Sequence, residues 1–231
     1  MSKSGQLRLS RTRTIPVPNE YIKALQGECA AWSYDEEKAP TFKGQWRSAA
    51  FGVAEDAPLD LEIGTGNGLH FANRALKFPK RNIVGLELKY KPLIQSIRRA
   101  LRNDSKNARM ARYNAYIIDE IFAPEEINDI FIFFPDPWEK TRHHKHRMIQ
   151  DRSLQVFYDL QKPGSYLWFK TDSRDYFDWA LEHFQRSPYK MLGHSYDLHN
   201  SEFVADNFVT QFENLFLRQK LPIHFAKLQK A

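Results

Sequence analysis

The sequence predicts an α/β fold in which helices cover both faces of a mostly parallel sheet. Short apolar runs alternate with amphipathic segments from Leu59 onward, which is typical of parallel strands joined by helical crossovers. The run Ile-Phe-Ile-Phe-Phe at 130–134 has no polar alternation, so it fits a central strand buried on both faces. A glycine-rich loop at 64–68 stands between an apolar run and a helical pattern, as in nucleotide-binding folds.

The individual elements follow in a regular order. Strands are expected at 59–63, 83–88, around 110–113, 130–134 and 166–170. Helices are expected between them, because apolar side chains recur at helical spacing through 71–75, 93–101, 154–160 and 176–184. The pattern of the carboxyl-terminal part favours closing antiparallel strands, with Thr210–Glu213 as an edge strand.

Length and composition predict one principal domain. A chain of 231 residues with 42% hydrophobic content can bury one sizeable core. Residues 1–50 are mostly polar and carry Arg8, Arg11 and Arg13, so we interpret them as a basic, mobile amino-terminal arm and lead-in segment. Such an arm either orders on a polyanion or is an ordinary solvated terminus. The principal domain is expected over residues 51–231.

The same summary indicates a reduced compartment and an anionic partner. A single cysteine, Cys29, excludes an intramolecular disulfide, and the first 16 residues lack the apolar stretch of a signal peptide. No apolar run is long enough to cross a membrane. We therefore expect a cytoplasmic protein without membrane contact. The net charge of +6 favours an anionic partner, although charge informs on attraction and not on fold.

The glycine loop and two acidic residues predict an adenosine site. Leu69 replaces the last glycine of the dinucleotide pattern, so no pyrophosphate site is complete. Glu87 ends the second strand at the spacing where a carboxylate accepts hydrogen bonds from ribose hydroxyls. Glu62 lies inside an apolar strand, where an unpaired charge is costly. We expect its partner to be a nearby Lys or Arg, or the amino group of a bound ligand.

The segment after the central strand indicates chemistry on a nucleic-acid base. The strand leads into Pro-Asp-Pro-Trp at 135–138 and then into a dense cationic run at 140–147. A carboxylate beside an aromatic ring, next to a strip that attracts polyanions, suits that chemistry. Trp138 is either a stacking platform or a lid on the core, and we favour the core. The cationic run is either an RNA contact or a solvated face.

The histidines within that run raise the question of a metal site. His143, His144 and His146 are adjacent or alternate, which is unlike the spacing of structural zinc ligands. The neighbouring lysines and arginines would also repel a cation. We therefore expect no metal.

Taken in order, these motifs resemble the tRNA (guanine-N7)-methyltransferase family, of the bacterial single-chain type, which uses S-adenosylmethionine. The resemblance rests on five motifs: LEIGTGNG at 61–68, GLEL at 85–88, FFPDPWEKTRHHKHR at 133–147, KTD at 170–172 and TQFE at 210–213. It implies a seven-stranded Rossmann-like domain. It also implies transfer of a methyl group to N7 of a guanosine in the tRNA variable loop.

The resemblance also implies roles for residues at the matching positions. The cofactor-binding residues would be Glu62, Gly64, Gly66, Glu87, Asn114, Ala115 and Asp136, with Asp136 also nearest the reaction. The guanosine would be held by Lys140, Asp172, Thr210, Gln211, Phe212 and Glu213. The RNA contacts would be Arg142, His144, Lys145 and Arg147. The chain departs from the family at Asn114, where aspartate is common, at His146, where arginine is common, and near a frequent glycine at Lys220.

The chemistry of guanine N7 fits acidic side chains without a base. N7 carries a lone pair and no proton, so its methylation requires no general base. The purine becomes positive as it accepts the methyl group, and carboxylates such as Asp136 and Asp172 would stabilise that charge. Two other classes stay open: an RNA-binding scaffold with an inactive site, and a methyltransferase with another acceptor. A monomer and a homodimer are both compatible with the sequence.

Overall fold

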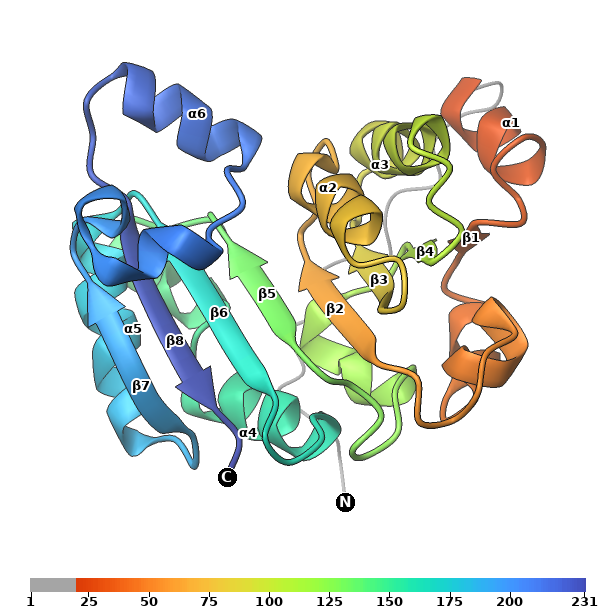
Figure 1. Ribbon diagram of the computed structural model, residues 1–231. Helices are drawn as coiled ribbons and strands as arrows, with labels where there is room; N and C mark the ends of the chain where they lie inside the picture. The colour runs from red at the N-terminus through yellow and green to blue at the C-terminus, as the bar shows by residue number, and fades with distance from the viewer. Residues whose placement is uncertain (1–19) are drawn as a thin grey trace.

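A computed structural model describes residues 20–231, which form one sheet of eight strands between two layers of helices (Figure 1). The strand order is β1-β4-β3-β2-β5-β6-β8-β7. Neighbours are parallel except at β8, which runs antiparallel to β6 and β7. The strands are β1 Ser33–Tyr34, β2 Leu59–Ile63, β3 Asn82–Leu86, β4 Ala108–Ala111, β5 Ile130–Phe133, β6 Tyr166–Thr171, β7 Lys190–Ser195 and β8 His224–Gln229.

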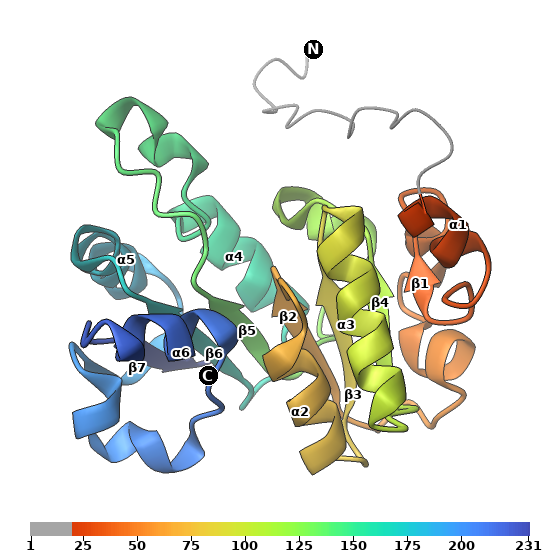
Figure 2. The ribbon, with the colours of Figure 1, turned by 90° about the horizontal axis from the view of Figure 1, so that it is seen from above.

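The helices form two layers (Figure 2). On one face α2 and α3 lie side by side with α1 next to α3, and α4 and α5 cover the other face. The α-helices are α1 Glu20–Gln26, α2 Leu69–Lys77, α3 Tyr90–Arg102, α4 Asp151–Leu160, α5 Arg174–Arg186 and α6 Gln211–Arg218. Shorter helical turns, labelled η, are η1 Ala39–Phe42, η2 Trp46–Phe51, η3 Ala115–Glu120, η4 Thr141–His146, η5 Leu198–Asn200 and η6 Glu202–Asp206.

The predicted α/β class and the mostly parallel sheet are confirmed, with two differences in the elements. The eighth strand is β1, a two-residue strand that pairs with β4 at the sheet edge. The expected edge strand at Thr210–Glu213 is wrong, because these residues begin α6. The Thr210 hydroxyl oxygen accepts a hydrogen bond from the Glu213 N–H, and the Glu213 carboxylate accepts one from the Thr210 N–H. This reciprocal capping box satisfies backbone groups that a strand would have left for pairing. The sequence T-x-x-E carries that signal.

The expected mobile arm does not extend over residues 20–50. Ala24 and Cys29 are buried in the cluster formed by α2 and α3. Tyr34 and Trp46 are buried in the larger cluster on the α4 and α5 side, and the Trp46 indole donates to the Ile121 carbonyl oxygen at 2.7 Å. These residues therefore belong to the folded domain. The arginines at 8, 11 and 13 lie outside the described residues.

The first central strand, β2, divides its side chains between apolar and polar roles. Leu59, Leu61 and Ile63 join the larger apolar cluster. The alternate residues, Asp60 and Glu62, point to the opposite face because side chains alternate along a strand. There they meet α2, whose His70 and Arg74 are four residues apart and therefore share one helix face.

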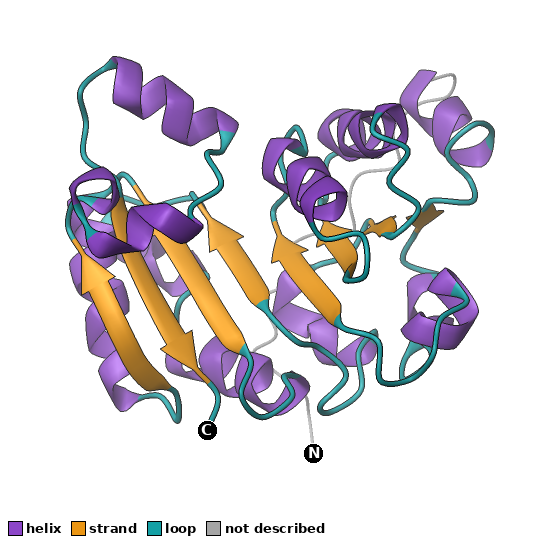
Figure 3. Ribbon diagram, viewed as in Figure 1, coloured by secondary structure: helices purple, strands orange, loops and turns teal. Residues whose placement is uncertain are grey.

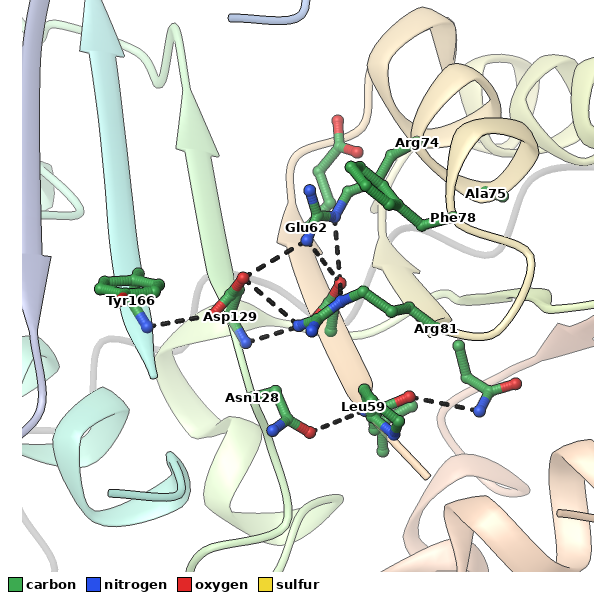
Figure 4. Close-up of polar contacts among 12 residues, drawn as sticks. Leu59, Glu62, Arg74, Ala75, Phe78, Arg81, Asn128, Asp129 and Tyr166 are labelled. Atoms are coloured by element: carbon green, nitrogen blue, oxygen red, sulfur yellow. Dashed lines mark hydrogen bonds and ion pairs between the residues drawn. The ribbon is translucent and has the colours of Figure 1, made fainter. Parts of the chain in front are cut away.

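Asp60 is the buried centre of a network of four charges (Figure 4). Its carboxylate accepts hydrogen bonds from Arg74 at 2.8 Å and from Arg81 at 2.5 Å, and both arginines also contact Asp129 at 3.3 Å. Burial, reinforced by the charge of Asp60, raises the pKa of Asp129. Asp129 also accepts a hydrogen bond from the backbone N–H of Tyr166. The network fixes α2 to β2 and to the beginnings of β5 and β6.

Candidate active site

The predicted site residues follow the carboxyl ends of adjacent parallel strands. In spatial order, Asn114 follows β4, Glu87 follows β3, the glycine loop follows β2, Asp136 follows β5 and Asp172 follows β6. Figure 3 shows the arrows of β2 and β5 ending at the same edge of the sheet. The direction of strand addition reverses between β2 and β5, and ligands of open α/β sheets bind in the crevice at such a switch point.

The glycine loop leaves space for a ligand at the end of β2. Gly64, Gly66 and Gly68 have φ of 76°, 54° and 75°, in the left-handed region that favours glycine. A Cβ on Gly68 would lie 2.5 Å from Ser96 Cα, so this glycine permits close packing of the loop on α3. A Cβ on Gly64 or Gly66 would meet nothing within 4 Å. The first two glycines therefore border open space, as a loop that contacts a ligand requires.

Glu87 braces this loop from the neighbouring strand. Its carboxylate accepts hydrogen bonds from the Gly66 N–H at 3.2 Å and from the Lys89 N–H at 2.9 Å. Burial raises the pKa of Glu87 above its usual range, although these N–H groups oppose the shift. The residue is thus held beside the loop, between β3 and β2.

Glu62 has a partner that the sequence interpretation did not identify. Its Oε2 lies 2.7 Å from His70 Nδ1, and both side chains are buried. The described partner is therefore a histidine of α2, where we expected Lys, Arg or a ligand amine. His70 could have been found from its position four residues before Arg74, on the helix face that meets β2.

Asn114 shapes the end of β4. Its Oδ1 accepts a hydrogen bond from the Tyr116 N–H at 3.0 Å, which caps the turn η3, and Ala115 is buried behind it. A carboxylate at this position would make the same cap, since Asn and Asp are both preferred there. Either residue therefore fits the local geometry at the end of β4.

The loop after β5 has an unusual backbone on both sides of Asp136. Phe134 and Trp138 have φ of 53° and 46°, which is rare for bulky residues. The Phe134 N–H donates to the Lys170 carbonyl oxygen at 2.8 Å, which ties the loop to β6. The Asp136 side chain is exposed. Burial of Tyr116, together with the negative charge of Asp136, raises the pKa of Tyr116 to about 12.

Comparison with known proteins identifies the family. A family model described as "Putative methyltransferase" matches residues 56–226. The tRNA (guanine-N(7)-)-methyltransferase of Bdellovibrio bacteriovorus is 49% identical over 90% of this chain and 99% of its own length. The protein of that name from Lachnoclostridium phytofermentans is 34% identical over 93% of this chain and 95% of its own. The chain belongs to the tRNA (guanine-N7)-methyltransferase family.

Solved structures agree with this methyltransferase at the level of the fold. The 16S rRNA methyltransferase KamB aligns over 86% of this chain and 94% of its own, with a TM-score of 0.57 and 12% identity. An rRNA methylase from Streptococcus thermophilus aligns over 76% and 88%, with a TM-score of 0.52 and 14% identity. The predicted Rossmann-like methyltransferase fold is thereby confirmed.

The lysines and arginines in the basic run of this methyltransferase are exposed, with one exception. Lys140, Arg142 and Lys145 lie on the surface around η4, and His144 is half-buried with its ring against Trp179. The expected RNA contact of Arg147 is wrong, because this residue is fully buried and cannot contact RNA directly.

Arg147 instead anchors the loop. Its Nε donates to the Pro137 carbonyl oxygen at 2.8 Å, and its guanidinium bonds to Asp175 and lies over the rings of Tyr176 and Trp179. Trp138 also differs from our expectation. Its ring contacts His143 and His146, outside the hydrophobic core.

The carboxyl-terminal motif lies against the same loop through α6. The Phe134 ring contacts the rings of Phe212 and Phe216, with centroids 6.3 and 5.6 Å apart. Gln211 and Phe212 are exposed. Thr210 and Glu213 are buried, and Glu213 has no exposed surface, so its carboxylate is not accessible for the direct contact with guanosine that the resemblance implies. Asp172 is half-buried, and burial raises its pKa.

Two negative findings apply to residues 20–231. No helix there is long and apolar enough to span a bilayer. Within the same range, no group of three or more His, Cys, Asp or Glu side chains is placed to hold a metal ion.

Proposed function

We propose that this chain transfers a methyl group from S-adenosylmethionine to N7 of a guanosine in the tRNA variable loop, in the cytoplasm, as a monomer or homodimer. Membership of the family indicates the class of reaction, which is methylation of guanine N7 in tRNA. One structural observation supports the site: the glycine loop, Glu87, Asp136 and Asp172 all follow strands that end at one sheet edge, around its switch point.

The cofactor would lie across the ends of β4, β3 and β2. Glu87 would accept hydrogen bonds from the ribose hydroxyls, and Asn114 and Ala115 would border the adenine. Gly64 and Gly66 offer backbone and open space to the amino-acid portion, with Glu62 behind them. S-adenosylmethionine, when bound, supplies the electrophilic methyl group. The protein's task is to orient that group towards N7.

Asp136 and Asp172 would act on the charge of the base. Neither removes a proton, because N7 has none to lose. Burial disfavours the ionised form of Asp172. A purine that becomes cationic beside it gives this carboxylate a positively charged partner in the transition state, which the neutral purine of the ground state does not provide. Lys140, Gln211 and Phe212 are exposed around this edge and would hold the guanosine.

Mapping the methylated base tests the proposal. The full-length protein is incubated with methyl-labelled S-adenosylmethionine and an unmodified tRNA transcript, and the labelled nucleoside is identified. We expect N7-methylguanosine in the variable loop, and no label in a transcript whose variable-loop guanosine is replaced by adenosine. Label on adenosine, on another loop, or on protein alone would reject the assignment.

The raised pKa of Glu87 predicts a pH-dependent cofactor affinity. Ribose hydroxyls donate to the ionised carboxylate, so affinity is expected to be full above the raised pKa and to weaken as pH falls through it. Titration calorimetry with S-adenosylmethionine at a series of pH values measures this. Glu87→Gln should bind more weakly at neutral pH and lose the dependence. An unchanged pH profile in that variant would remove Glu87 from the cofactor site.

The exposed cations near η4 predict a salt-dependent RNA affinity. Replacing Arg142 and Lys145 with alanine should weaken tRNA binding and reduce the slope of log K against log salt by about 1 for each phosphate that is no longer neutralised. Filter binding at several salt concentrations measures the slope. Lys190→Ala is the matched control, because Lys190 is exposed at the start of β7, at the opposite sheet edge. Equal slopes in all variants would place the RNA elsewhere.

A further inference from the structure

Lys170, near the end of β6, is a buried cation that the proposed chemistry does not use. Only 2% of the residue is exposed. Its Nζ donates to Asn207 Oδ1 at 2.6 Å, to the Phe208 carbonyl oxygen at 2.9 Å and to Glu213 Oε2 at 2.8 Å. All three donor positions of the ammonium group are thus occupied, two by the segment that leads into α6 and one by Glu213 in the first turn of α6.

The carboxylate of Glu213 is equally committed. Its Oε2 accepts from Lys170 and from the Thr210 N–H at 3.2 Å, and its Oε1 lies 2.6 Å from Asn207 Nδ2 and 2.7 Å from His199 Nε2. The proximity of Lys170 lowers the pKa of Glu213 against the effect of burial. The amino end of α6 is therefore attached to β6 by an ion pair inside the protein.

The same lysine residue also connects to the loop that carries Asp136. Its carbonyl oxygen accepts the Phe134 N–H, and its Nζ lies 4.2 Å from the centroid of the Phe133 ring. Asp172 follows two residues later in the chain. Lys170 thus contacts or adjoins the three segments expected to surround the guanosine: the Asp136 loop, Asp172 and the amino end of α6.

Stability alone does not account for this arrangement. Removing two charges from water costs about as much as their attraction returns, and well-packed apolar pairs often serve as well or better. A buried ion pair does fix the relative position of its partners, because each needs the other at hydrogen-bond distance. The arrangement is therefore suited to holding α6 in one place relative to β6.

We infer that Lys170 is a positioning residue, which sets the placement of Gln211 and Phe212 against the Asp136 loop and so aligns the guanosine with the methyl group. This inference rests on the proposed function. It also assigns Glu213 to the same task, acting through Lys170 and not on the base.

The test compares Lys170→Met with Lys230→Met. Lys230 is the matched control, because it is also a buried lysine, bonded to the Gln161 carbonyl oxygen and 3.7 Å from Glu125, but it lies at the opposite sheet edge. Lys170→Met should lower kcat for tRNA methylation by about 100-fold, the effect expected of misplaced reactants. Its affinity for S-adenosylmethionine should stay within about twofold of wild type. Lys230→Met should keep wild-type kcat.

Hydrogen exchange provides a readout that does not depend on activity. In the full-length protein, Lys170→Met should speed deuterium uptake in residues 207–218 and leave the sheet peptides unchanged, whereas Lys230→Met should not affect 207–218. If wild type fails to methylate tRNA, the proposed function fails, while the exchange result still decides the role of Lys170. Wild-type exchange in 207–218 of folded Lys170→Met would overturn the inference.

A double-mutant cycle separates positioning from direct contact. Because both residues serve one link, Lys170→Met and Glu213→Met should reduce kcat non-additively, so that the double variant is no slower than the slower single variant. Glu213→Gln, which removes only the charge, replaces any methionine variant that does not fold and should show the same exchange change. Additive losses in kcat would indicate that Glu213 contacts substrate independently and would overturn the shared role.

Discussion

Replacing Asp136 with alanine is expected to lower kcat by about 10²–10³-fold, the effect of removing one preorganised electrostatic group. The loss should fall mainly on kcat, because the proposed interaction strengthens only as the purine gains positive charge. The affinity for S-adenosylmethionine, measured by calorimetry, should change much less. Single-turnover methylation of a tRNA transcript measures the chemical step.

Two further variants make the Asp136 result specific. Asp136→Asn keeps the shape and removes the charge, so it should resemble the alanine variant. Asp56→Ala removes an exposed carboxylate from the segment before β2, at the opposite edge of the sheet, and should leave kcat unchanged. Near-normal turnover by Asp136→Asn would show that charge stabilisation is not its role. Equal losses in kcat and cofactor affinity would assign Asp136 to cofactor binding.

Of the variants proposed for this protein, Asp60→Asn should lose the most free energy of unfolding. Asp60 is 1% exposed and holds Arg74 and Arg81 through its two oxygens. Breaking a buried pair by removing one partner costs about 3–5 kcal/mol, because the remaining charges stay buried. In a chain of this length each kcal/mol lowers Tm by about 2–4 °C, so we expect a decrease of at least about 6 °C in scanning calorimetry.

An exposed ion pair provides the contrast for Asp60. Glu28 and Arg98 are bonded at 2.6 Å, but both side chains are about half exposed. Glu28→Gln should leave Tm close to wild type, since exposed pairs contribute little. A Tm of Asp60→Asn equal to that of Glu28→Gln would mean that the remaining arginine and aspartate side chains rearrange without cost, and the network would not be a stabilising element.

Much of the fold could be predicted because its signals are local. The strand at 59–63, the glycine loop at 64–68 and the apolar strand that begins at Ile130 depend on neighbouring residues. All three are present in the structure, although β5 ends at Phe133, one residue earlier than predicted. The order of acidic residues after successive strands follows from the same pattern. The pattern of Thr210–Glu213 predicted an edge strand where α6 begins, although the capping signal T-x-x-E is also local.

The remaining site features depend on tertiary contacts. Nothing in the run at 140–147 distinguishes exposed Arg142 from buried Arg147, which is covered by the rings of Tyr176 and Trp179 from α5. Likewise, the partners of Lys170 come from about 40 residues later in the chain. Motif resemblance marks such positions as important but does not say whether they contact the substrate or support another residue.

The anchorage of Arg147 has a consequence for engineering. Because its guanidinium is fixed between Pro137 and α5, the segment Thr141–His146 lies between two firmly held points and does not include Lys140. Exchanging that segment for the corresponding stretch of a relative should therefore alter which tRNAs are selected while leaving the methyl-transfer apparatus intact.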